Sequence, residues 1–147
     1  MELDTALAQD EKVSQEYKFS YALFLFFLKT HFWLTNKRLI INAPNVFLFI
    51  PTGKNTVTYP LRNIGGVQTK TEFKFWNLVG GVILLLIGLK AFWLLALLGV
   101  ILIVSAFQTV ISLGATGGAF ARYYYLPWEA TSAKKMINEL NQLIANI

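Results

Sequence analysis

The run from Trp76 to Leu113 constrains this chain more than any other stretch, because it is 38 residues long with one charged residue and no proline. The charge, Lys90, separates two apolar blocks, Val79–Leu89 and Ala91–Ala106. A helix needs about 20 apolar residues to cross a bilayer. The run therefore predicts two short helices that cross a membrane as a hairpin with its tip near Lys90. Small residues that allow such helices to pack closely are Gly80, Gly81, Gly88 and Gly99.

The composition agrees with this interpretation. Hydrophobic residues make up 55% of the chain and charged residues only 14%, and the apolar excess lies in one block, as in integral membrane proteins. There is no cysteine, which excludes a disulfide framework and a thiolate metal site. The amino terminus is acidic and polar, unlike a secretory signal, so we expect the internal block to insert.

The net charge of +5 is unevenly distributed. Residues 1–16 carry a net charge of −4, residues 17–126 carry +9, and residues 127–147 are neutral. A basic body beside an apolar hairpin favours anionic lipid headgroups as the counter-surface, since each basic residue near such a surface gains about 1 kcal/mol. Nucleic acid is the competing partner for a basic chain. We do not expect it, because the predicted hairpin already places the body at a membrane.

Short apolar runs separated by turn residues predict a meander of antiparallel strands before the hairpin. The first expected strand is Tyr17–Leu28, which is rich in aromatic residues. Residues 31–41 read as two strands around a turn at Thr35–Arg38. Further turns are expected at Asn42–Asn45 and Pro51–Asn55 from their Asn, Pro and Gly content.

Regular strand patterns also flank the hairpin. Polar and apolar residues alternate along Gly66–Trp76, which predicts a half-buried strand that leads directly into the first helix. After the hairpin, Thr109–Leu113 and Ala119–Leu126 read as a strand pair around a turn at Gly114–Gly118. Beyond Pro127, apolar residues at three- and four-residue steps predict a carboxy-terminal amphipathic helix. These residues are Ala133, Met136, Ile137, Leu140, Leu143, Ile144 and Ile147.

The order of strands, strand pair and final helix, together with two short motifs, resembles bacterial pleckstrin-homology (PH)-like domain proteins. The motifs are Leu34–Ile41, LTNKRLII, and Tyr59–Ile64, YPLRNI, with Val67 three residues later. The apolar segment Gly80–Gly88 and the later Leu113–Gly118 resemble a branch of that family with a transmembrane hairpin. The resemblance covers roughly residues 10–147.

This resemblance implies an α+β membrane protein: a PH-like antiparallel β-sandwich or barrel with a carboxy-terminal amphipathic helix and an inserted two-helix transmembrane hairpin. The implied division is an acidic lead-in at residues 1–16, a split PH-like domain at 17–75 and 108–147, and the hairpin at 76–107.

Residues suited to catalysis or metal binding do not cluster in the sequence. His31 is the only histidine, and no acidic partner is evident in the sequence around it. No paired carboxylates or metal-ligand spacing occur, and Gly114–Gly118 lacks the lysine of a phosphate-binding loop. We therefore predict that the protein is not an enzyme and has no catalytic, cofactor-binding or metal-binding residues and no small-molecule substrate.

Basic and aromatic residues near the expected membrane are the candidate contacts. Lys37 and Arg38 either form a solvated turn or contact lipid headgroups, as loop cations do in phosphoinositide-binding relatives. Lys70 and Lys74 share one strand face ahead of the hairpin and are further candidate headgroup contacts. Interfacial anchors are predicted at Trp76, Lys90 and Trp93.

The predicted function is that of a membrane-anchored docking or scaffold protein that binds a protein partner or self-assembles. The alternatives are an anionic-lipid-sensing module and an accessory subunit of a larger membrane complex. Basic residues flank the hairpin on the cytoplasmic side by the positive-inside rule. We therefore expect an integral inner-membrane protein with the PH-like domain and both termini in the cytoplasm.

Overall fold

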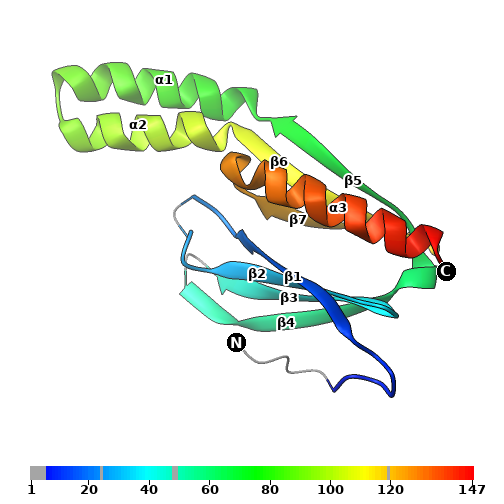
Figure 1. Ribbon diagram of the computed structural model, residues 1–147. Coiled ribbons are helices and arrows are strands. Elements are labelled where there is room, and N and C mark those ends of the chain that lie inside the picture. Colours follow the sequence, from blue (N-terminus) through cyan, green and yellow to red (C-terminus); the bar gives the residue numbers. More distant parts are fainter. Residues whose placement is uncertain (1–5, 24, 48–49, 119) are drawn as a thin grey trace.

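The computed structural model describes residues 6–23, 25–47, 50–118 and 120–147, and this part of the chain forms two antiparallel sheets and three α-helices (Figure 1). The first sheet has the order β1 (Val13–Ser20), β2 (Lys29–Thr35), β3 (Arg38–Phe47) and β4 (Ile50–Pro60). The second consists of β5 (Ile64–Phe73), β6 (Phe107–Ala115) and β7 (Phe120–Tyr125). The helices are α1 (Phe75–Lys90), α2 (Trp93–Ser105) and α3 (Ala130–Ala145).

Both sheets and α3 share one hydrophobic core. Alternate residues point inward along each strand, as the period of two requires. The core includes Phe32, Leu34, Leu39 and Ile41 from the first sheet, Ile111 and Leu113 from the second, and Met136 and Leu140 from α3. Each of these side chains is at most 2% exposed. Figure 1 shows α3 lying along the second sheet, on the side that faces the first.

A partly buried carboxylate joins the end of β1 to the start of α3. Glu129 Oε2 accepts a hydrogen bond from the Ser20 backbone N–H at 3.0 Å, and Oε1 accepts one from the Ser20 hydroxyl at 2.8 Å. The backbone N–H of Leu126 also donates to Glu129, at 3.2 Å. Glu129 thereby joins segments 109 residues apart.

The predicted two-helix transmembrane hairpin is wrong. In the described part of the chain, no helix is long and apolar enough to cross a membrane. The helices α1 and α2 contain 16 and 13 residues, against the roughly 20 that a crossing needs. The apolar run appeared longer because it includes residues 107–113, which belong to β6. The predicted integral inner-membrane location depended on that hairpin and is corrected with it.

Three strand-level predictions are also wrong. The strand predicted at Tyr17–Leu28 ends at Ser20. In the segment that follows it, the side chains of Phe26 and Phe27 are 63% and 62% exposed. The turns predicted at Asn42–Asn45 and Pro51–Asn55 instead lie within β3 and β4, which pair along a long two-stranded ribbon. A register shift between Asn45 and Val46 accommodates the irregular sequence.

Other elements are where the patterns predicted them. The two strands around Thr35–Arg38 are confirmed as β2 and β3, and the carboxy-terminal amphipathic helix is confirmed as α3. The strand before the hairpin is confirmed as β5, and the pair after it as β6 and β7. The first residue expected of the last strand, Ala119, lies outside the described residues, as do the first five of the acidic lead-in.

Candidate interaction surface

The hairpin of α1 and α2 is held together by close contact between glycines and the opposite helix. A Cβ atom on Gly88 would overlap the backbone of Ala96, and one on Gly99 would lie 2.5 Å from the Leu85 backbone nitrogen. A Cβ atom on Gly81 would lie 2.8 Å from the Gly99 carbonyl oxygen and from Ile103. These glycines therefore allow a backbone approach that no other residue permits. By contrast, Gly80 faces open space.

Because glycines occupy the inner face, the large apolar side chains of the hairpin point outward. We call these the hairpin surface: Phe75, Trp76, Val82, Ile83, Leu86, Ile87, Leu89, Phe92, Trp93, Leu94, Leu97, Leu98 and Val100. Trp76 is 80% exposed and Leu89 72%. Fully burying one such side chain is worth roughly 1.5–3 kcal/mol. Isolated proteins do not normally leave so many large apolar side chains exposed to water.

Polar groups in the hairpin are confined to its two ends. Lys90 at the tip is its only charged residue. At the root, where α1 begins and α2 ends, Asn77 Nδ2 donates a hydrogen bond to the Ser105 hydroxyl at 3.4 Å. The hairpin surface between these ends is apolar without interruption.

The second sheet holds the hairpin by its root. The Lys74 backbone N–H donates to the Ala106 carbonyl at 2.8 Å, which extends the β5–β6 ladder up to the helices. The Phe73 and Phe107 rings lie 5.3 Å apart beside this bond. Figure 1 shows the hairpin continuing beyond the sheets as an arm. Its direction is therefore fixed by the sheet that carries it.

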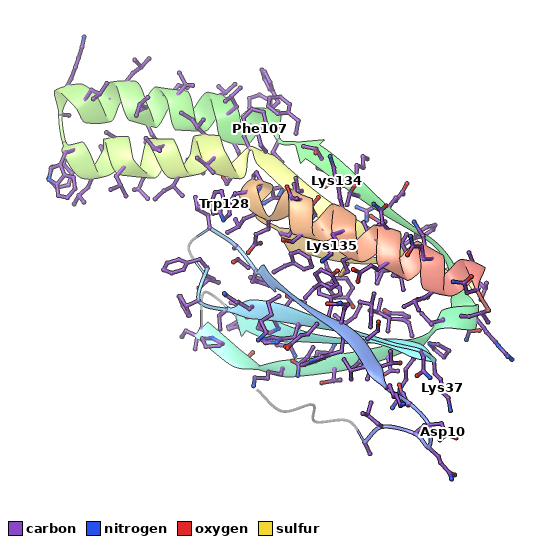
Figure 2. All side chains as sticks on the ribbon, in the orientation of Figure 1. Asp10, Lys37, Phe107, Trp128, Lys134 and Lys135 are labelled. Atoms are coloured by element: carbon purple, nitrogen blue, oxygen red, sulfur yellow. The ribbon has the colours of Figure 1, made fainter. Side chains whose placement is uncertain are left out.

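The predicted headgroup contacts do not come together in one surface. Lys70 and Lys74 lie on β5 and at the start of α1, at the hairpin end of the molecule. Lys37 lies next to Asp10 at the opposite end (Figure 2). A single lipid-facing patch containing all four predicted cations is thus not present.

The turn that carries Lys37 and Arg38 binds the amino-terminal segment instead of standing free. Lys37 Nζ donates to the Gln9 carbonyl at 2.7 Å, and Arg38 Nη2 to the Ala6 carbonyl at 2.8 Å. Residues 6–12 therefore form a strap across the β2–β3 turn. Lys12 completes it, because its N–H donates to the Asn36 side chain at 3.1 Å.

Glu11 is the anchor of the strap. Its side chain is fully buried and accepts hydrogen bonds from Arg38 Nε at 2.8 Å and from the Thr35 hydroxyl at 2.7 Å. Burial opposes ionisation, but the hydrogen bonds from Arg38, the Ala8 N–H and Thr35, with the Arg38 charge, lower the pKa of Glu11 to about 2. The carboxylate thus stays ionised inside the protein.

His31 has an acidic partner that the sequence did not reveal. Its Nδ1 lies 3.0 Å from Glu16 Oε1, and its ring stacks on Trp33 with centroids 5.3 Å apart. The hydrogen bond with His31 and the neighbouring Lys18 lower the pKa of Glu16, although burial opposes this. The sequence predicts Glu16 as the last residue of the lead-in, whereas in the structure it belongs to β1 and pairs with Trp33 of β2. Within the described residues, no group of three or more potential metal ligands is close enough to hold an ion.

The predicted anchor residues occupy the two ends of the hairpin. Trp76 lies at its root, and Lys90 and Trp93 lie at its tip. Their predicted role at membrane interfaces rested on a spanning hairpin, which the structure does not have. What they share in the structure is exposure, and both tryptophans belong to the hairpin surface.

Comparisons with protein-family models, with curated proteins and with solved structures found no match to this chain. The resemblance to bacterial PH-like domain proteins therefore stays a prediction. The function has to be argued from the surface described above.

Proposed function

We propose that this chain is a non-enzymatic docking module that assembles with a second copy of itself through the hairpin surface. The observation that supports the proposal is the uninterrupted apolar exterior of α1 and α2. Contiguous exposed apolar patches mark interaction sites in proteins.

The spacing of the exposed side chains suits helix packing. Val82, Leu86 and Leu89 on α1 follow steps of four and three residues, as do Trp93, Leu97 and Val100 on α2. Such rows form ridges that fit into the grooves of a similar helix. The surface between root and tip carries no charge, so two copies can meet without burying an unpaired ion.

The size of the surface sets the expected strength of assembly. A 16-residue helix is about 24 Å long, and two packed helices are about 20 Å wide, which gives a footprint of about 480 Å². A standard interface buries about 800 Å² on each partner. The hairpin alone therefore supports a modest interface, and we expect a dissociation constant in the micromolar range.

Sedimentation velocity of the full chain, from about 1 to 100 µM, tests the proposal. The hairpin variant carries Val82→Gln, Leu86→Gln, Trp93→Gln and Leu97→Gln. A matched control carries four exposed substitutions on α3: Thr131→Gln, Lys134→Gln, Asn138→Gln and Asn141→Gln. We expect the wild type and the control to dimerise with rising concentration, and the hairpin variant to stay monomeric.

Three outcomes would overturn self-assembly. A wild-type chain that is monomeric throughout the range contradicts it directly. A monomer that co-purifies with a different chain through the same four residues makes the protein an accessory subunit. A monomer that floats with phosphatidylserine vesicles, and loses this property in the hairpin variant, makes it a lipid-binding module.

A further inference from the structure

A cavity of about 210 Å³ lies on the outer face of the first sheet, on the side opposite the core. His31 of β2 pairs directly with Asn42 of β3, and both line this cavity. Their neighbours Phe32 and Ile41 point into the core, so the alternation of each strand turns His31 and Asn42 outward. The rest of the wall consists of Phe27, Leu28, Lys29, Pro44 and Lys54.

Asn42 presents an unpartnered amide to the cavity. The residue is only 5% exposed, and its side chain makes no hydrogen bond within the described chain. Among the described residues, the side-chain atoms that are both sealed from solvent and unbonded belong to Tyr17 and Gln108. Because Asn42 is not one of them, its amide remains accessible from the cavity.

His31 presents a hydrogen-bond acceptor to the same cavity. The Glu16 carboxylate lies 3.0 Å from Nδ1 and can only accept, so Nδ1 carries the hydrogen. In the neutral ring Nε2 is then an acceptor. Since the two nitrogens face different sides of the ring, Nε2 is directed away from Glu16 of β1. The described residues that line the cavity include none of β1, which places the cavity on the Nε2 side.

Lys29 supplies a positive charge beside these two groups. It lies two residues before His31 on β2, which separates the two positions by about 7 Å on one face of the strand. Lys29 takes part in none of the ion pairs of the described chain. The one carboxylate on β1 to β4, Glu16, already binds His31 and Lys18. Lys29 can therefore bind an anion.

We propose that this cavity binds a small 2-hydroxy carboxylate, in which a hydroxyl sits on the carbon next to the acid group. The carboxylate pairs with Lys29, the hydroxyl donates to His31 Nε2, and the Asn42 amide donates to the hydroxyl oxygen. The short alkyl part lies against Leu28 and Pro44. This site does not depend on self-assembly, because none of these residues belongs to the hairpin surface.

Titration of the full chain at pH 8 with three probes of equal shape tests the site. The probe 2-hydroxyisobutyrate has both polar groups, pivalate replaces the hydroxyl by a methyl group, and 2-hydroxyisobutyramide replaces the charged oxygen by an amino group. We expect 2-hydroxyisobutyrate to bind at least about fivefold more tightly than either comparator, because each of them leaves one polar group of the site without its partner.

The imidazole of His31 reports the hydroxyl contact directly. His31 is the only histidine of the chain, so its ring ¹⁵N signals in nuclear magnetic resonance need no separate assignment. The unbound protein should show the hydrogen on Nδ1. The Nε2 signal should then move with 2-hydroxyisobutyrate and stay in place with pivalate.

Two variants identify the contacts, and a third serves as the control. His31→Phe should remove the preference for 2-hydroxyisobutyrate over pivalate, and Lys29→Gln the preference over the amide. Lys70→Gln removes the same charge from β5, in the other sheet, and it should change neither preference.

Equal affinity for the three probes, or preferences that survive His31→Phe and Lys29→Gln, would overturn the proposal. An unbound spectrum with the hydrogen on Nε2 would do the same. The wild-type spectra decide the matter even if a variant does not fold. Saturable movement of the His31 Nε2 and Asn42 amide signals supports the site, and binding without it, or no saturation at millimolar concentration, contradicts it.

Discussion

At the scale of single residues, Glu11 anchors the strap with a side chain that is fully buried. A fully buried carboxylate is stable only when its hydrogen bonds replace the water it has lost. Arg38, Thr35 and the Ala8 N–H do this for Glu11. The motif residues Thr35 and Arg38 are thus explained by a structural contact within the chain, and the sequence could not show it because 24 or more residues separate the partners.

Replacing this carboxylate should destabilise the protein in a pH-dependent way. Glu11→Gln is expected to lower the free energy of unfolding by about 1.5–3 kcal/mol at pH 7, since it removes hydrogen bonds to an ionised group. The folded-state pKa lies below the ordinary value of 4.5. The stabilisation is therefore complete above pH 4.5 and disappears as the pH falls toward about 2. Urea unfolding of both proteins at several pH values measures this difference.

Asp10→Asn provides the control for Glu11. Asp10 adjoins Glu11, and its backbone carbonyl accepts a hydrogen bond from Asn36 Nδ2. Its φ is 63°, a conformation that asparagine tolerates. We expect little change in stability at any pH. A Glu11→Gln protein as stable as the wild type at pH 7 would show that the anchor contributes nothing.

At the scale of elements, the close packing of α1 against α2 depends on the glycines that face the opposite helix. Gly88→Ala should force α1 and α2 apart and cost about 1–3 kcal/mol, the usual range for overpacking. Gly80→Ala should instead stabilise α1 by up to about 1 kcal/mol, because its Cβ meets open space and alanine favours helix. Hydrogen exchange of the α1 and α2 amides reports both effects. Equal protection in the two variants would contradict the described packing.

Sequence patterns predicted elements well where one period dominated. Alternation located β5, and a three- and four-residue repeat located α3. The pattern fails at Tyr17–Leu28, because apolar content predicts burial there, whereas the side chains of Phe26 and Phe27 are exposed. It also failed at the length of the hairpin, since apolar residues of β6 continue the run after Ala106 without a break in composition.

At the scale of the whole molecule, the hairpin is an addition to a domain that is complete without it. The core cluster contains residues of both sheets and α3, and none from α1 or α2 in the described chain. Neither this independence nor the cavity beside Gln108 could be predicted, because both depend on how distant segments pack. This cavity lies at the root of the hairpin, and residues 21–23, 74, 104–105, 107–108 and 124–127 form its wall.

Removing the hairpin should therefore leave the rest folded. A chain in which Asn-Gly replaces residues 75–105 joins Lys74 to Ala106 by a two-residue turn suited to paired strands. At low micromolar concentration, where assembly contributes little, we expect its melting temperature to lie within a few degrees of the wild-type value. Thermal unfolding followed by near-ultraviolet circular dichroism checks this. A chain without a cooperative transition would show that the hairpin is part of the folding unit.

The link between Ser20 and Glu129 has a consequence for synthesis on the ribosome. Glu129 cannot bind the end of β1, and α3 cannot close the core, until the chain has been translated beyond residue 129. The hairpin needs only its own 31 residues, Phe75–Ser105, to pair its helices. Its apolar exterior therefore emerges before the body of the protein is complete. During that interval a nascent chain of this kind is a natural client for chaperones.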